Sequence, residues 1–133
     1  MPPALDHTAI AVNSLDEALE RYGRLFDAHL VERLHVRDQQ IEAAFVSVDG
    51  AMLELIEPTS EDSPVARSIQ KRGEGLHHIA FAVADIHAEL RRLKESGARL
   101  VDREPRRGVH GLMAFVHPES TSGVLVELVQ NDP

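Results

Sequence analysis

The stretches Asp6-His7-Thr8-Ala9-Ile10-Ala11-Val12 and His77-His78-Ile79-Ala80-Phe81-Ala82-Val83 follow one pattern, in which a histidine precedes alternating apolar and small residues. His7 and His78 hold the same place in the two stretches and lie 71 residues apart. Alternation of this kind is typical of a half-buried β-strand. The chain therefore contains two similar strands, each with a histidine near its start.

A second pair of stretches repeats at nearly the same distance. Residues 51–57 read Ala-Met-Leu-Glu-Leu-Ile-Glu, and residues 124–130 read Val-Leu-Val-Glu-Leu-Val-Gln, which places Glu54 and Glu127 73 residues apart. Two matched pairs at nearly the same offset indicate an internal repeat. Each copy of the repeat carries one early histidine and one late glutamate.

Length favours a shared core for the two copies. The chain has 133 residues, and half of it, about 65 residues, would be marginal as an independent domain. We therefore expect a single domain over residues 1–133. It would consist of a first repeat (5–58), a connecting segment (59–75) and a second repeat (76–130).

Composition excludes several classes of protein. The net charge of −8 argues against a nucleic-acid partner, which needs cations for its phosphates. The absence of cysteine removes disulfides and thiolate chemistry and suits a reducing cytoplasm. The first residues do not resemble a signal peptide, and no apolar run approaches about 20 residues. We predict a cytoplasmic protein with no membrane segment.

Local signals place the elements of the first repeat. Ser14 with Glu17 fits a helix-capping box, and an apolar stripe follows at helical spacing as far as Phe26. Asp49-Gly50 is a strong hairpin-turn signal. We expect one helix from about residue 15 to residue 26, and strands over 5–12, 30–36, 41–48 and 51–56.

The same kinds of local signal place the elements of the connecting segment and of the second repeat. Ser63-Pro64 predicts the start of a short helix that Gly73 ends, and Asp85 predicts the cap of a helix that ends before Gly97. A basic, glycine-flanked loop is expected over residues 105–111. The predicted strands of this repeat cover 78–83, 99–102, 112–117 and 124–130.

Each repeat therefore has the order β-α-β-β-β, and the fold class is α+β. One such unit leaves a face of its sheet uncovered, so we expect the two tandem units to form a curved, half-closed mixed sheet around a cleft. The first and last strands of each unit are the natural central pair. That pairing would bring His7 near Glu54 and His78 near Glu127.

Two histidines and two glutamates at equivalent places suggest a metal centre. Imidazole nitrogen and carboxylate oxygen suit divalent Zn, Co, Ni, Mn or Fe. A glutamate between Leu or Val neighbours is also hard to bury without a cation. His77 is the rival of His78, but the repeat favours His78, and adjacent strand residues point to opposite faces. The expected ligands are His7, Glu54, His78 and Glu127.

The chain resembles the vicinal-oxygen-chelate superfamily and, within it, the methylmalonyl-CoA epimerase family. The resemblance covers nearly the whole chain. The paired His and Glu motifs indicate the superfamily. The stretches that point to the epimerases are Ser63-Pro64-Val65-Ala66, Gly75-Leu76-His77-His78, Gly108-Val109-His110-Gly111, Phe115-Val116-His117-Pro118 and Gly123-Val124-Leu125-Val126-Glu127-Leu128.

The resemblance implies a paired βαβββ fold, a homodimer, an acyl-CoA substrate and a role in propionate metabolism. It also implies a divalent metal, with cobalt as the first choice and Zn, Mn or Ni as alternatives. The four ligand positions match His7, Glu54, His78 and Glu127, although family members vary at the position of Glu54. Members of the family also have a glutamate that acts as a base in the middle of the first unit, and Glu42 fits that position.

The implied reaction interconverts (R)- and (S)-methylmalonyl-CoA. The proton between the two carbonyls leaves, and a proton returns on the other face of the carbon, with a metal stabilising the enolate. Inversion needs two proton-transfer groups. The hypothesis assigns them to Glu42 and Glu127, while an outward-facing Glu42 is an equally consistent interpretation of its strand.

Two rival functions remain open. A glyoxalase I-like lyase would use a similar His/Glu site and similar proton transfer, and a metal-free binding or resistance protein would use the same cleft to sequester a small molecule. For a CoA substrate the cations that could contact phosphate are Arg67, Lys71, Arg72, Arg103, Arg106 and Arg107.

Overall fold

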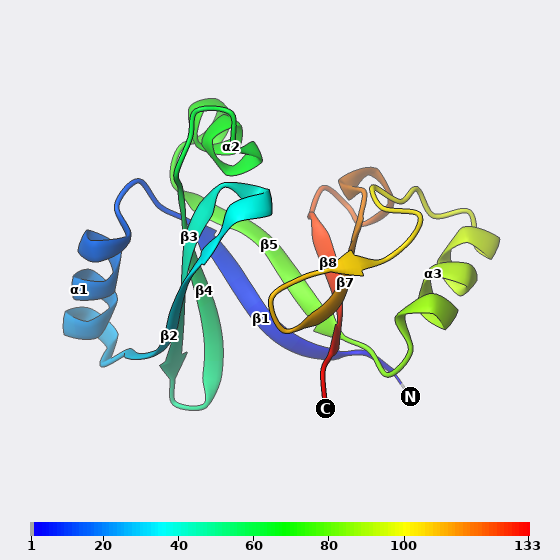
Figure 1. Cartoon of the computed structure of the whole chain (residues 1–133), viewed down its shortest axis with the longest axis horizontal. Coiled ribbons are helices and arrows are strands. Elements are labelled where there is room, and N and C mark those ends of the chain that lie inside the picture. The colour runs from blue at the N-terminus through cyan, green and yellow to red at the C-terminus, as the bar shows by residue number, and fades with distance from the viewer. Residues whose placement is uncertain (1) are drawn as a thin grey trace. The chain divides into compact units, whose positions relative to one another are not determined.

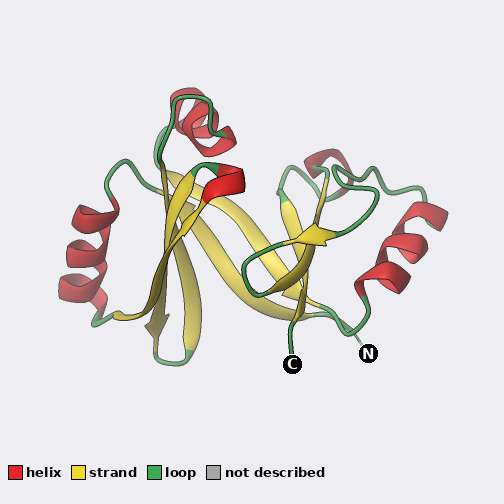
Figure 2. Cartoon of the chain, viewed as in Figure 1, coloured by secondary structure: helices red, strands yellow, loops and turns green. Residues whose placement is uncertain are grey.

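The structure, a computed structural model, describes residues 2–133 and divides them into two compact units (Figure 1). The N-terminal unit is His7–His77, and the C-terminal unit joins His78–Pro133 to residues 2–6. Each unit has the predicted order βαβββ, and the first unit also carries the connecting helix (Figure 2). The α+β class and the two tandem repeats are therefore confirmed.

The N-terminal unit contains a four-stranded sheet in the order β2-β3-β4-β1. Strands β1 and β4 are parallel, and the other neighbours are antiparallel. The elements of this unit are β1 (Ala4–Ala11), α1 (Leu15–Phe26), β2 (His29–Val36), β3 (Ile41–Val48), β4 (Ala51–Pro58) and α2 (Pro64–Arg72), with a short 3₁₀ turn at Arg37–Gln39.

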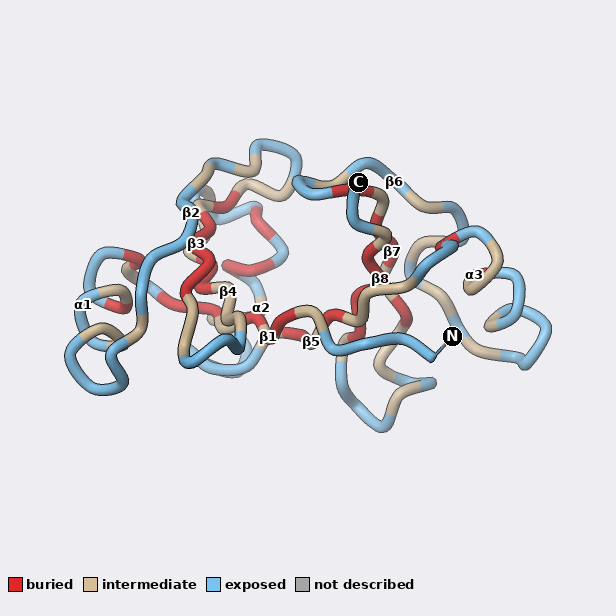
Figure 3. The backbone as a smooth tube through the Cα atoms, turned by 90° about the horizontal axis from the view of Figure 1, so that it is seen from below, coloured by how far each residue is buried: buried red, intermediate tan, exposed pale blue. Residues whose placement is uncertain are grey.

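The two faces of this sheet pack against different partners. One face, called the α1 face, packs with helix α1 through a cluster of Val12, Leu15, Ala18, Ala44, Val46 and Leu55. The other, called the His7 face, carries Ala9, Ala11, Ile41, Ala43 and Ile56, which pack with Val65 of α2. Among the strands of this unit β3 carries most of the buried residues, and β1 and β4 carry the rest (Figure 3). The sheet is thus the core of this unit.

The C-terminal unit repeats the arrangement with the strand order β5-β8-β7-β6. Strands β5 and β8 are parallel, and the remaining pairs are antiparallel. Helix α3 covers one face through a cluster of Ile86, Leu90, Ala114, Val116, Val126 and Leu128. The elements are β5 (Gly75–Ala82), α3 (Ile86–Glu95), β6 (Arg106–Arg107), β7 (Gly111–Val116) and β8 (Val126–Asn131), with a 3₁₀ turn at Pro118–Ser120.

The predicted caps and turns are confirmed at atomic level. The side chains of Ser14, Ser63 and Asp85 each accept a hydrogen bond from a backbone N–H of the first helical turn. These contacts satisfy amides that have no partner inside the helix. Asp49 and Gly50 both have positive φ, of 47° and 87°, as a two-residue hairpin turn requires.

The expected strand over residues 99–102 is wrong. Only Leu100 forms a bridge, to Val116, and the edge strand of this unit is instead the two-residue β6. The reason is the Asp102 carboxylate, which accepts the Phe115 N–H at 2.8 Å and occupies a donor that a regular strand would use.

No helix within residues 2–133 is long and apolar enough to cross a membrane.

Gly111, the first residue of β7, is fixed by a close backbone contact. A Cβ at this position would overlap the carbonyl oxygen of Gln130 on the neighbouring strand. We expect Gly111→Ala to lower the free energy of unfolding by about 2–3 kcal/mol, because a backbone atom cannot move aside as a side chain can. Urea titration followed by circular dichroism measures this change.

Gly23→Ala in helix α1 is the matched control. Its Cβ would meet only the Ala28 carbonyl oxygen at an ordinary 3.6 Å, so we expect about 0.5–1 kcal/mol of stabilisation from helix propensity. A Gly111→Ala variant as stable as the parent protein would show that the β7–β8 approach is looser than described.

Candidate functional site

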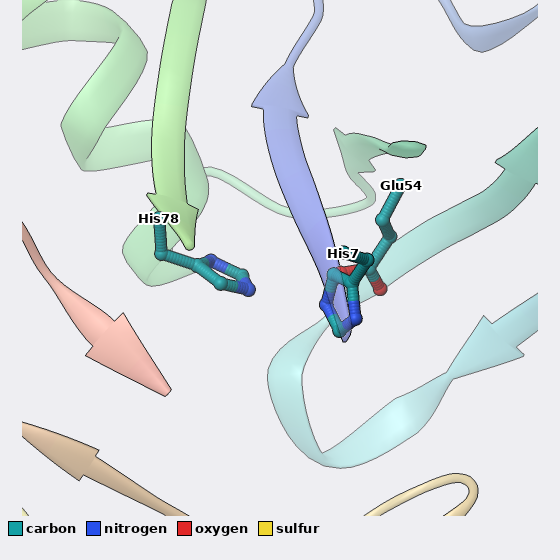
Figure 4. Close-up of side chains that lie close together, drawn as sticks. All are labelled: His7, Glu54 and His78. Carbon is teal, nitrogen blue, oxygen red and sulfur yellow. The ribbon is translucent and has the colours of Figure 1, made fainter. Parts of the chain in front are cut away.

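The N-terminal unit buries a His–Glu pair on its His7 face. Strands β1 and β4 pair in parallel with Ala9 opposite Glu54, so His7 and Glu54 project from the same side. The His7 Nε2 atom lies 3.2 Å from the Glu54 Oε1 atom, and the two side chains are only 6% and 13% exposed (Figure 4). The His7 ring stands edge-on to Phe45 at 5.5 Å between centroids.

The C-terminal unit contains the same pair in the same surroundings. Ala80 of β5 lies opposite Glu127 of β8, and His78 projects from β5 (Figure 4). The His78 Nε2 atom lies 3.4 Å from the Glu127 Oε1 atom, with 6% and 12% of the side chains exposed. The His78 ring stands edge-on to Phe115 at 5.4 Å. The repeat therefore preserves a three-residue cluster as well as a sequence pattern.

Both pairs fit the requirements of metal ligation. His7 Nε2 and His78 Nε2 are buried atoms directed at carboxylate oxygens. Two donors, each about 2.1 Å from one ion, are separated by roughly 3.0 Å at a right angle and roughly 3.4 Å at a tetrahedral angle. The separations of 3.2 and 3.4 Å lie in this range. A buried carboxylate also needs a cation close by, which a divalent ion would supply.

A family model described as the Glyoxalase/Bleomycin resistance protein/Dioxygenase superfamily matches residues 6–117 of the chain. The chain belongs to this superfamily. Its His–Glu pairs stand at equivalent strand positions in the two repeats.

Similar proteins refine this placement within the superfamily. An ethylmalonyl-CoA/methylmalonyl-CoA epimerase of Cereibacter sphaeroides is 38% identical over 95% of this chain and 96% of its own length. A methylmalonyl-CoA epimerase structure from Mycobacterium tuberculosis has a TM-score of 0.92 and 39% identity, covering 98% of this chain and 89% of that one. A methylmalonyl-CoA epimerase in complex with methylmalonyl-CoA and NH4+ has a TM-score of 0.90 and 36% identity, covering 98% and 96%. The chain therefore groups with the epimerases, which are isomerases.

His78, and not His77, shares a cluster with a glutamate in this superfamily member. His78 is 7% exposed and has the same orientation as buried Ala80. His77 points to the other face of β5, together with Ile79, which packs on the α3 side. The repeat alignment therefore predicted correctly that His78, and not His77, lies beside a glutamate. Metal ligation by His78 stays a prediction.

Glu42 lies on the α1 face, away from the His7 face. Its Oε1 atom is 3.2 Å from His35 Nδ1, and its Oε2 atom is 3.8 Å from Arg33 Nε. Arg33 also hydrogen-bonds Asp16 of helix α1 at 2.6 Å. That hydrogen bond is the main reason why the pKa of Arg33 is raised, and the charges of Asp16 and Glu42 add to it. The structure thus places Glu42 on the face opposite the His–Glu pair, which does not support the hypothesis that it is a proton-transfer residue.

Strand alternation explains this placement. On β3, Glu42 has the parity of Ala44 and Val46, which pack against α1, whereas Ala43 packs on the His7 face. The sequence predicted the strand over 41–48, and in such a strand Phe45 has the opposite parity to Glu42. Nothing in the sequence alone showed which parity would face the histidine.

The candidate phosphate-binding cations lie on three different segments. On or next to α2, Arg67 donates to the Asp62 carbonyl oxygen and Arg72 to Ser68 Oγ. Arg106 lies over the Phe115 ring at 6.0 Å and pairs with Asp102 at 3.3 Å. Lys71 is exposed on α2, and Arg107 pairs with Asp132. Arg103 lines a pocket of about 330 Å³ together with Lys94 and Arg99.

The Arg107–Asp132 pair ties β6 to the end of the chain. The hydrogen bond from Arg107 is the main reason why the pKa of Asp132 is lowered, and the same contact raises the pKa of Arg107. The loop expected over residues 105–111 contains β6, so only residues 108–110 form a loop between β6 and β7, where Gly108 N–H donates to the Gly111 carbonyl oxygen at 2.7 Å. His110 is an exposed residue of this loop.

Proposed function

We propose that this protein interconverts the (R) and (S) forms of methylmalonyl-CoA by removing and returning the proton at C2. A divalent metal ion, held by His7, Glu54, His78 and Glu127, is part of the proposal, with cobalt as the first choice. These residues carry the donor types of such a site. The native metal would be a cofactor of the protein, and the acyl-CoA thioester its substrate.

The observation that carries the proposal is the duplicated buried His–Glu pair. Both pairs have the same donor atoms, nearly the same separation and an aromatic ring in the same position. Structural ion pairs in a core do not usually recur in this way at equivalent positions. The kinship with methylmalonyl-CoA epimerases supplies the reaction class and the substrate class.

The chemistry follows from the acidity of the substrate. The C2 proton lies between a thioester carbonyl and a carboxylate, and its removal leaves an enolate. A bound divalent ion would stabilise the negative charge of this enolate. The protein's own residues then have to hold the substrate, exclude water and move protons at C2.

Glu127 is proposed as one proton-transfer group. Its carboxylate is 12% exposed and lies in an apolar strand between Val126 and Leu128, where it is shielded from bulk water. Epimerisation needs a second group for the other face of C2. Glu42 is not proposed for that role, because its carboxylate lies on the α1 face beside His35 and Arg33.

Proton NMR in heavy water tests the proposed function. We expect purified protein to replace the C2 hydrogen of (S)-methylmalonyl-CoA with deuterium and to produce the (R) isomer. A chelator should stop both processes, and added Co²⁺ should restore them. Metal-loaded protein that exchanges no C2 hydrogen would refute the epimerase proposal, and turnover of a glutathione hemithioacetal would then identify a glyoxalase I-like lyase.

The expected homodimer belongs to the same proposal. The chain has a mass of 14.7 kDa, so light scattering after gel filtration should give about twice this value. A monomeric mass in the presence of metal would contradict the dimer without affecting the proposed reaction.

A further inference from the structure

The correction of Glu42 leaves the second proton-transfer group unassigned, and strand β2 carries a candidate. Glu32 lies opposite Phe45 in the β2–β3 pairing, whereas His35 lies opposite Glu42. Directly opposed residues of antiparallel strands project from the same face. Glu32 therefore shares the His7 face with Phe45, and His35 shares the α1 face with Glu42.

Independent contacts agree with this assignment of faces. Val36, which has the parity of Glu32, packs against the cluster of the His7 face. Arg33 and His35, which have the other parity, contact Glu42 on the α1 face. Glu32 is exposed, so its carboxylate is accessible to a molecule that binds on the His7 face.

A β-bulge sets the orientation of Glu32. Leu30 pairs with Val46 and Glu32 pairs with Phe45, so Val31 is an extra residue without a partner of its own. With uninterrupted pairing, Val31 would lie opposite Phe45 and Glu32 would point to the α1 face. Bulges often redirect a side chain in this way next to functional sites.

Glu32 and Glu54 flank Phe45 in one row across the sheet. Phe45 is paired with Glu32 on one side and with Glu54 on the other. Two strand spacings put the Cα atoms of the two glutamates roughly 10 Å apart. Between them lies the apolar Phe45 ring, which also contacts His7. A small acyl group resting on this ring would have a carboxylate on either side.

No other carboxylate competes for the role among the described residues of β2, β3 and β4. Apart from Glu54, which is a proposed ligand, the acidic residues of β2, β3 and β4 are Glu32, Glu42 and Glu57. Glu57 lies opposite Glu42 in the β3–β4 pairing and accepts the N–H of Leu15 at the start of α1. Both therefore belong to the α1 face.

We infer that Glu32 is the second proton-transfer residue of the epimerase, an inference that rests on the proposed function. The Glu32 carboxylate removes the C2 proton from one isomer, and the electron pair of the C–H bond stays in the enolate. Glu127, in its acid form, donates a proton to the other face of C2. The reverse turnover, or exchange with water, returns both carboxyl groups to their starting states.

Glu32→Gln tests the inference, with Glu42→Gln as the matched control from the neighbouring strand. Each isomer of methylmalonyl-CoA is incubated separately in heavy water, and deuterium at C2 is measured apart from inversion. We expect Glu32→Gln to lower inversion at least 100-fold while exchange from the isomer served by Glu127 continues. Glu42→Gln should keep both processes within about threefold of the parent protein.

Metal content and melting temperature are measured on the same samples, and both should be unchanged in Glu32→Gln. Glu32→Asp should recover part of the inversion, because it restores a carboxylate at a shorter reach. Normal inversion by Glu32→Gln would overturn the inference and leave the proposed function intact. Loss of exchange from both isomers together with lost metal would also overturn it, since that indicates a structural role. A parent protein that inverts neither isomer would overturn the proposed function itself.

Discussion

Glu127→Gln is expected to lower kcat for epimerisation by about 10²–10⁴-fold, the range typical of a lost general acid–base group. The amide has nearly the shape of the carboxylate but cannot accept a proton from carbon. Its amide oxygen can still contribute a ligand atom to the proposed metal site beside His78 Nε2, which lies 3.4 Å from the present Oε1 atom. We therefore expect β8 to keep its place in the sheet and the melting temperature to change little.

The measurement is the rate of deuterium exchange at C2 with each isomer, at saturating substrate. Glu119→Gln is a suitable control, because Glu119 is an exposed residue that pairs with Arg99 at the surface. Its loss should leave turnover unchanged, since exposed ion pairs contribute little. If Glu127→Gln kept more than a tenth of the parent kcat, Glu127 would not be a proton-transfer residue.

His7→Ala is expected to remove the stabilisation that the protein gains from metal. At a free metal concentration of 100 times the dissociation constant, binding stabilises the folded state by about 2.7 kcal/mol. For a domain of this size that raises the melting temperature by roughly 8–12 °C. His7→Ala removes an imidazole that is 6% exposed and lies 3.2 Å from Glu54, so most of this rise should disappear.

Thermal melting with increasing Co²⁺ or Zn²⁺ measures the effect without any need for activity. His35→Ala is the matched control, because His35 also lies beside a glutamate but is half-exposed on the α1 face. It should keep the full metal-dependent rise. A parent protein whose melting temperature does not respond to metal, or a His7→Ala variant that responds normally, would contradict ligation by His7.

The helix starts could be predicted because each depends on a few adjacent residues. The repeat and the paired histidines could be predicted because the same short patterns occur twice in the sequence. Ser14, Ser63 and Asp85 cap helices through contacts that are local in sequence. The His–Glu pairs could also be predicted, since the first and last strands of a βαβββ unit become neighbours. The arrangement of the two units around one cleft stays a prediction.

The sheet faces on which Glu42 and Glu32 lie could not be predicted from the sequence in the same way. The face of a strand residue depends on pairing with other strands, and the extra residue Val31 changes that pairing by one position. A one-residue change exchanges the two faces, so a simple alternating pattern across β2 is misleading. The failed strand over 99–102 has a similar origin, because the Asp102 side chain replaces a backbone partner.

The C-terminal unit contains a contact between two segments that are far apart in the sequence. Asn131 Nδ2 donates a hydrogen bond to Asp6 Oδ1 at 3.1 Å, although 125 residues separate them along the chain. A short linker between these two segments, with new ends in the exposed Gly73–Gly75 join, would give a circular permutant. In such a circular permutant the second repeat would be translated first. A permutant that folds and binds metal would show that neither unit requires the present linear order of the two repeats.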